Sequence, residues 1–296
     1  MMSMKISSRS GKAVCTAALF TILLGTLSLS SYSSPASATP QPAVPDYEVK
    51  LFLDPADVLD SNHQLKSSVR TYFGMPSTKT KMSVEYLDTS DLDINDAGWN
   101  VRARKLEDYS DDEFQITYKK RYPITNGNID AALAAAALDG FDAGEDDYEA
   151  QVDWGYSKQT LSFSNKKTVH HNGYDGMELL SENDAIDEAI SHAPGKFEDW
   201  GSNNWGTDKL DDSKAYGPVD AKRWIGTWQN KTMYIEVWEI KKESGSGYDY
   251  VVEASFKTPS RTDAANGIAQ LQSDLTQQGW FLPTDELKTQ MILDRY

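Results

Sequence analysis

The segment Asp46-Tyr47-Glu48-Val49-Lys50 decides the fold, because charged and apolar residues alternate along it. Side chains two residues apart point to the same face of a β-strand, so Asp46, Glu48 and Lys50 share one face. Tyr47 and Val49 share the other. The sequence therefore predicts a strand with one charged face and one apolar face.

Four more segments carry polar and charged residues at every second position. Their shared faces hold Arg102 and Arg104, Thr117 and Lys119, Glu149, Gln151 and Asp153, and Glu253, Ser255 and Lys257. A strand with one solvated face explains any single segment. The whole set favours strands that close into a barrel with their charged faces inward. Because an unpaired buried charge is costly, such a cavity predicts a site for a metal-bound polyanion.

The amino terminus has the pattern of a secretory signal peptide over residues 1–38. A basic stretch precedes the apolar run 13–29, and small residues up to Ala38 follow it. The basic residues are Lys5, Arg9 and Lys12. An uncleaved membrane anchor is the alternative, but the run is as short as a signal-peptide core and a small-residue cleavage site follows. We expect cleavage after Ala38 and a secreted or periplasmic product with no stable membrane span.

The mature chain is predicted to have two parts. Residues 39–45, TPQPAVP, form a short extended tether, and residues 46–296 form one barrel domain. Cys15 is the only cysteine and lies within the predicted signal peptide, so no disulfide is expected in the product.

The net charge argues against binding of nucleic acid. The whole chain carries a formal charge of -16, and removing the three cations of the signal leaves about -19. A strongly acidic protein repels a phosphate backbone. A cavity closed off from solvent can still be basic, because the local field governs it.

Strands and helices alternate along the mature chain. Strands are expected at residues 81–87, 99–105, 114–121, 222–228, 233–240 and 248–257, in addition to those containing 46–50 and 149–153. Helices are expected at residues 54–73, 129–138, 181–192 and 263–278. Residues 165–220 are rich in Gly, Asn and Asp and are predicted as a loop-rich insertion over one end of the sheet.

The order of these motifs resembles that of the CYTH, or triphosphate tunnel metalloenzyme, superfamily from Asp46 to the carboxyl terminus. Members begin with a Glu-x-Glu-x-Lys strand, to which Asp46, Glu48 and Lys50 are similar. The motifs that follow in the same order are Tyr86-Leu87-Asp88-Thr89, Arg102 with Arg104, the strand ending in Lys119, Glu149 to Asp153, Lys222-Arg223, and Glu253-Ala254-Ser255.

The resemblance implies a β-rich α+β fold, an eight-stranded antiparallel closed barrel with peripheral helices. Its tunnel binds a triphosphate with one or two divalent cations. The implied phosphate ligands are Lys50, Arg102, Arg104, Lys119 and Arg223, whose forked or compact cationic groups suit phosphate oxygens. Lys222 points to the opposite face and is the second choice.

Carboxylates of the same strands are the implied metal ligands. For Mg²⁺ or Mn²⁺ they are Glu48, Glu149, Asp153 and Glu253, with Asp46 in the first or second coordination shell. The implied catalytic residues are Lys50 and Glu48. Positioning and charge neutralisation accelerate phosphoryl transfer, so no nucleophilic side chain is needed.

Three departures from the family pattern put activity in question more than fold. Asp46 is one methylene shorter than Glu, Gln151 is uncharged, and Ser255 stands where a second acid would complete the last motif. Of the two acids on the strand before it, Glu236 is favoured over Glu239 as a compensating group, since the two point to opposite faces.

Two functions follow from these residues. The first is a secreted metal-dependent phosphohydrolase acting on triphosphate, a nucleotide or another polyphosphorylated small molecule. The second is a noncatalytic secreted barrel that binds a polyanion or, through Trp200 and Trp205, a carbohydrate. The sequence leaves the substrate, the preferred metal and the oligomeric state open.

Overall fold

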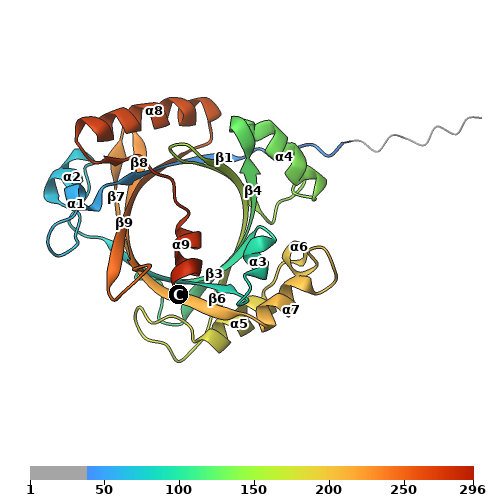
Figure 1. Cartoon of the computed structure of the whole chain (residues 1–296). Helices are drawn as coiled ribbons and strands as arrows, with labels where there is room; N and C mark the ends of the chain where they lie inside the picture. Colours follow the sequence, from blue (N-terminus) through green and yellow to red (C-terminus); the bar gives the residue numbers. More distant parts are fainter. Residues whose placement is uncertain (1–38) are drawn as a thin grey trace, which may run out of the picture. The chain divides into compact units, whose positions relative to one another are not determined.

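Nine strands close into a barrel within residues 39–296, the part of the chain that the computed structural model describes (Figure 1). Residues 1–38, with the predicted signal peptide and Cys15, lie outside this part. The strands are β1 (Asp46–Leu53), β2 (Thr80–Asp88), β3 (Trp99–Leu106), β4 (Glu113–Ile124), β5 (Glu149–Trp154), β6 (Gln159–His170), β7 (Lys214–Trp228), β8 (Lys231–Lys241) and β9 (Tyr248–Thr258).

The strand order is β1-β5-β6-β4-β3-β2-β7-β8-β9, and β9 pairs with β1 to close the ring. The neighbours are antiparallel except β1 and β5, which run parallel with Glu48 opposite Asp153. A further two-residue strand, β10 (Phe281–Leu282), pairs with the end of β1.

The predicted fold class is confirmed, with one strand more than expected and one parallel pair. The additional strand is β6, whose second half falls in the segment predicted as loop-rich. From Asn165 to His170 most side chains on both faces are polar, so the alternation that marks the other strands is lost. The chain reaches β5 through a helical connection and not a hairpin, which allows β5 to join β1 in parallel.

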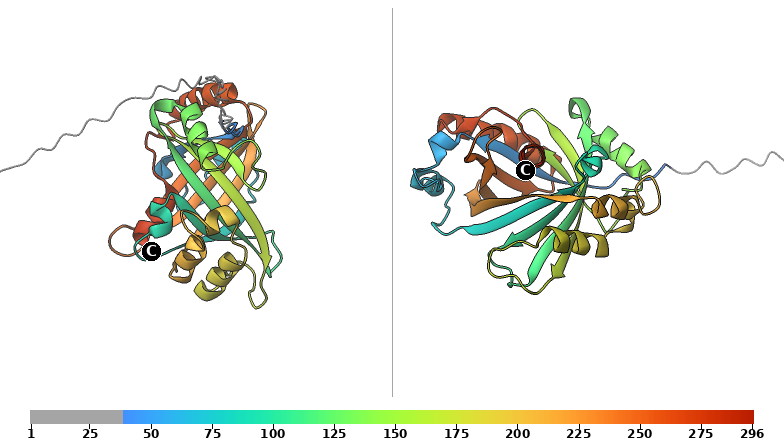
Figure 2. Two further views of the ribbon diagram at one scale, coloured as in Figure 1. Left: turned by 90° about the vertical axis from the view of Figure 1, so that its right-hand side faces the viewer. Right: turned by 60° about the horizontal axis from the view of Figure 1, so that its bottom comes forward.

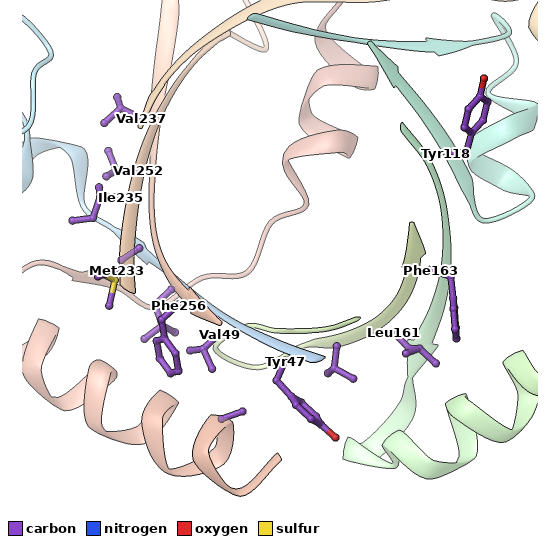
Figure 3. Packing of buried hydrophobic residues seen from close by; sticks show 14 of the residues in the cluster. Tyr47, Val49, Tyr118, Leu161, Phe163, Met233, Ile235, Val237, Val252 and Phe256 are labelled. Carbon is purple, nitrogen blue, oxygen red and sulfur yellow. The ribbon is translucent and has the colours of Figure 1, made fainter. Parts of the chain in front are cut away.

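The main apolar core lies outside the ring of strands, between the barrel and its helices. In Figure 3, Tyr47 and Val49 of β1, Leu161 of β6 and Phe256 of β9 point away from the lumen. Helix α8 (Arg261–Gln277) packs on β1 and β9, and α4 (Ile129–Leu138) packs on β4 and β6. Gly267 lets α8 approach closely, because a Cβ at that position would lie 2.5 Å from the ring of Phe256.

Most predicted helices are present, with local differences. The remaining ones are α1 (Pro55–Val58), α2 (Ser67–Tyr72), α3 (Asp93–Asp96), α5 (Glu182–Ser191), α6 (Gly195–Glu198), α7 (Trp205–Asp211), α9 (Lys288–Arg295) and a 3₁₀ turn at Thr125–Gly127. The helix expected at 54–73 is interrupted by a turn in which Asp60 accepts backbone hydrogen bonds. Ser181 caps α5 as predicted. None of the helices within residues 39–296 is long and apolar enough to cross a membrane.

Helices fill much of the segment 165–220 that was expected to be loop. It contains α5, α6 and α7 between the end of β6 and the start of β7. In the left view of Figure 2, α5 and α7 lie toward the opposite end of the barrel from α4 and α8. Trp200 packs edge to face on Trp99 at 5.5 Å and covers the ammonium of Lys120 at 4.1 Å, while Trp205 packs on Phe197. Both indoles pack on the outer core and are half-buried, and Trp200 also lines a surface pocket with Asp139 and Lys196.

Helix α9 lies inside the ring of strands (Figure 1). Its Ile292 and Leu293 are buried in a second apolar cluster with inward-facing side chains such as Tyr86 and Trp238. Arg295 holds the end of the helix through Asp249 at 3.0 Å. The C-terminal segment therefore forms part of the barrel interior.

A buried carboxyl on the outer side of β2 makes the stability depend on pH. Glu85 is 4% exposed, and its Oε1 has no hydrogen-bond partner within residues 39–296. Burial, together with the nearby Glu182, raises the pKa of Glu85 from 4.5 to about 7. Since the folded-state pKa is the higher one, this contribution to stability is complete below pH 4.5 and is lost as the pH rises to about 7.

We expect Glu85→Gln to raise the free energy of unfolding by about 2 kcal/mol at pH 8 and to change it little below pH 4.5. Urea unfolding of residues 39–296 at the two pH values measures the difference. Glu178→Gln, at an exposed position, is the control. An equal gain for Glu85→Gln at both pH values would contradict the assignment.

Candidate functional site

A cavity of about 530 Å³ lies inside the barrel, and all ten predicted site residues line it. They are Asp46, Glu48, Lys50, Arg102, Arg104, Lys119, Glu149, Asp153, Arg223 and Glu253. Glu236 also lines the cavity, whereas Lys222 does not, as the strand alternation predicts. The lining contains ten Lys and Arg side chains and eight Asp and Glu side chains, in a chain whose formal charge is -16. The interior is thus far more basic than the protein as a whole.

A basic wall, formed by Arg102, Arg104, Lys119 and Arg121 of β3 and β4, occupies one part of the lining. Arg104 donates to Gln115 Oε1 at 2.5 Å, and Arg102 reaches Thr117 Oγ1 at 3.5 Å. The Nε atoms of both arginines are buried without an acceptor within residues 39–296. Buried donors of this kind are available to an anionic ligand.

Burial and the close packing of cations lower the pKa values of two side chains in the basic wall. Burial, with the charge of Arg102, lowers the pKa of Arg104 to about 10. The pKa of Lys119 is lowered to about 8, mainly by burial; Asp153 raises this pKa, whereas Lys50, Arg121 and Arg102 lower it. An anion placed here would therefore relieve repulsion as well as form hydrogen bonds.

The first acidic pair, Glu48 and Asp153, lies side by side on the parallel strands β1 and β5. Lys50 Nζ lies 3.3 Å from Glu48 and 3.0 Å from Asp153. Gln151 Nε2 donates to the same two carboxylates at 2.8 and 2.7 Å, and its Oε1 accepts from Lys257 at 2.9 Å. Burial opposes ionisation, but the nearby cations, Lys50 foremost, together outweigh it and lower the pKa of both carboxyls.

The second acidic pair, Glu236 and Glu253, lies directly across the antiparallel strands β8 and β9. Lys288 of α9 bridges it, with Nζ 3.2 Å from Glu236 and 2.9 Å from Glu253. Arg223 donates to the other oxygen of Glu236 from Nε at 2.9 Å and from Nη2 at 2.6 Å. Arg223 was predicted as a phosphate ligand, but here its guanidinium group is bonded to the carboxylate of Glu236.

The predicted metal ligands do not come together in one cluster. Glu48 and Asp153 are adjacent, and Glu253 is paired with Lys288. Glu149 is exposed and paired with Lys166, and Asp46 is exposed. Positions two apart on a strand are separated by about 7 Å, so a shared face does not bring every acid to one ion. No group of three or more metal-binding side chains in the described part of the chain is arranged around a common point.

Several lining residues were not predicted. Arg121 continues the two-residue spacing from Lys119 and could have been identified from it. Lys257 was placed on an inward charged face with Glu253 and Ser255 but was given no role in the site. Lys288 had none, because it belongs to a helix that enters the barrel from the end of the chain.

The closed ring of strands, the enclosed cavity and the inward charged faces agree with the architecture implied by the motif order. The fold is a closed nine-stranded barrel around a charged cavity. No protein-family model and no curated protein sequence matches the chain.

Similar solved structures include HpAC1 from Hippeastrum, a candidate adenylyl cyclase described as having a dominant triphosphatase activity. It is 11% identical over 83% of this chain and 93% of its own, with a TM-score of 0.47. A candidate adenylate cyclase from Bacillus halodurans is 14% identical over 85% and 97% of the two chains, with a TM-score of 0.45. The PH1819 protein from Pyrococcus horikoshii is 13% identical over 83% and 98%, with a TM-score of 0.39.

The lowered pKa of Lys119 predicts how anion binding depends on pH. The ammonium is charged below about pH 8 and neutral above it. We therefore expect the affinity for inorganic triphosphate to fall roughly tenfold between pH 7 and pH 9.5, as measured by calorimetry on residues 39–296. Lys119→Arg, which stays charged, should remove most of this decrease.

The adjacent Lys120 also has a pKa of about 8 because of burial, but it faces Trp200 outside the barrel. The Lys119→Arg variant therefore distinguishes the contribution of Lys119 to the pH dependence from that of Lys120. Equal losses of affinity in the unmodified protein and in Lys119→Arg would rule out Lys119 as the titrating group.

Proposed function

We propose that the chain is a secreted phosphohydrolase of the triphosphate tunnel kind. Its substrate would be inorganic triphosphate, a nucleoside triphosphate or another polyphosphorylated small molecule. The observation that carries the proposal is the basic wall, in which the Nε donors of Arg102 and Arg104 are buried and have no acceptor in the described part of the chain. A small polyphosphate has the charge and the many acceptor oxygens that this wall requires.

The arrangement suits hydrolysis of a terminal phosphoryl group. Water attacks the terminal phosphorus while the bond to the bridging oxygen breaks. The rest of the polyphosphate leaves with that oxygen, and the proton lost by the water passes to a phosphate oxygen of the products. Most of the acceleration comes from positioning and neutralisation of charge. Arg102, Arg104 and Lys119 would hold the equatorial oxygens, Lys50 would neutralise charge at the transferred group, and Glu48 would orient the water.

We also propose that Mg²⁺ or Mn²⁺ enters with the substrate at Glu48 and Asp153. Two carboxylates are what Mg²⁺ commonly takes from a protein when phosphate oxygens and water complete its shell. Lys50, on a flexible four-carbon stem, can turn from these carboxylates toward a phosphate. The bound cation would supply charge neutralisation for the phosphate oxygens.

The second candidate is a barrel that binds a polyanion without hydrolysing it. Three side chains favour it. Gln151 and Ser255 stand where acids would strengthen a metal site, and Lys257 lies 4.0 Å from Glu48. Trp200 packs on Trp99 and Trp205 packs on Phe197, so a sugar is the ligand with the least support.

Phosphate release by residues 39–296 tests the proposal, with triphosphate or ATP and with Mg²⁺, Mn²⁺ or EDTA. We expect release that needs the metal and falls at least 100-fold in Arg102→Ala with Arg104→Ala, since each charge-assisted contact contributes about 1.5 to 3 kcal/mol. Lys222→Ala is the matched control, because Lys222 lies beside Arg223 but faces away from the cavity.

Two other results would change the conclusion. Triphosphate binding without release would favour the noncatalytic barrel. Release that is the same in the double variant and in the unmodified protein would reject the basic wall as the substrate site.

Export is tested separately. We expect the protein recovered outside the cytoplasm to begin at Thr39, as determined by amino-terminal sequencing and intact mass. Replacing Ala36 and Ala38 with bulky residues should block this cleavage. A recovered protein that retains Met1 would contradict the predicted signal peptide.

A further inference from the structure

The carboxylates of Glu236 and Glu253 form a pair that needs a cation. They occupy opposing positions of β8 and β9 and both line the cavity. Like charges directly opposite each other across antiparallel strands repel, and the cost rises where water is scarce. A pair of carboxylates in a polyphosphate site is also what a divalent cation would bind.

The cation present is the ammonium of Lys288. It lies within 3.2 Å of an oxygen of each carboxylate, and its side chain is 16% exposed. The ring of Trp238 lies 4.5 Å from the same ammonium, and its Nε1 donates to Glu236 Oε2 at 2.8 Å.

Lys288 is fixed in this position by the segment that carries it. Asp285 accepts hydrogen bonds from the backbone of Tyr156, Ser157 and Lys158 in the turn between β5 and β6. Thr289 accepts from Arg121 at 3.2 Å. The apolar side chains of α9 are buried inside the barrel. The backbone that carries Lys288 therefore cannot shift without breaking contacts to the β5–β6 turn and to β4.

This anchoring distinguishes Lys288 from Lys50. Lys50 lies on a strand beside the first acidic pair and can turn its flexible stem toward a phosphate without disturbing the backbone. The Lys288 side chain projects from a helix packed inside the barrel, between Trp238 and two carboxylates.

We propose that Lys288 is a built-in cation that takes the place of a divalent metal at the Glu236–Glu253 pair. The native protein binds no divalent metal at that pair. Any divalent ion that enters with substrate is therefore confined to Glu48 and Asp153, a consequence that rests on the proposed function. The predicted metal ligand Glu253 is instead a positioning residue, which holds α9 in the barrel through Lys288.

Binding of Mn²⁺ to residues 39–296, measured by electron paramagnetic resonance without substrate, tests the proposal. Lys288→Met keeps much of the length of the side chain and removes its charge. We expect this variant to gain one Mn²⁺ site per chain and to lose it again when Glu253→Gln is added. Lys288→Arg keeps the charge and should gain no site.

Three further measurements keep the test independent of folding and of activity. Lys288→Met should melt at a lower temperature than the native protein, because two buried carboxylates lose their cation, and Mn²⁺ should restore part of the difference. Glu253→Gln alone should leave Mn²⁺ binding unchanged. Asp153→Asn identifies any ion held at the first acidic pair.

The proposal is overturned if Glu253→Gln alone removes a bound Mn²⁺, or if folded Lys288→Met gains no site. Neither readout involves phosphate release, so a barrel without hydrolase activity would leave the Lys288 result intact. A failure at Lys288 would likewise leave the basic wall as a substrate site.

Discussion

Closure of the barrel places a ring of charged side chains around one cavity of about 530 Å³, and the rest of the structure accommodates that constraint. On β1 the residues alternate so that Tyr47 and Val49 pack beneath the outer helices while Glu48 and Lys50 enter the lumen. The apolar core is therefore outside the strands, and each inward charge must find a partner. Helices α4 and α8 cover the outer apolar face, which stabilises the ring.

The partners are distributed unevenly around the lumen. Each acidic pair has an ammonium between its carboxylates, Lys50 at one and Lys288 at the other. The cations of β3 and β4 lack such compensation, and the lowered pKa of Lys119 is the electrostatic consequence. In this site the acids have cationic partners, whereas the arginines have few acceptors. Such a site can bind an anion that carries several negative charges.

Whether the site hydrolyses its ligand depends on the neighbourhood of Glu48. Gln151 donates to both carboxylates of the first acidic pair, and Lys257 adds a second ammonium nearby. These groups reduce the negative charge that would attract Mg²⁺. A polyphosphate ligand would increase the affinity for Mg²⁺, since it would draw Lys50 away from the carboxylates and supply oxygen ligands of its own.

The sequence by itself determined the strands with alternating charge and the face on which each charge lies, because side-chain direction in a strand depends only on position along the chain. It placed Arg102, Arg104 and Lys119 in the cavity and Lys222 outside it. It also placed α4 and the cap of α5. Local signals of this kind do not require the distant parts of the chain. The polar second half of β6 had no alternation to reveal it.

Only the tertiary structure decided which charges meet. Glu48 joins Asp153 because β1 and β5 run parallel in a register that the intervening chain allows. Glu253 joins Glu236 and Lys288 because α9 returns into the lumen. These contacts depend on closure of the ring and on packing of Ile292 and Leu293 inside it. Ion pairs between residues far apart in sequence follow from how the strands and α9 pack, and no spacing within a single segment contains that information.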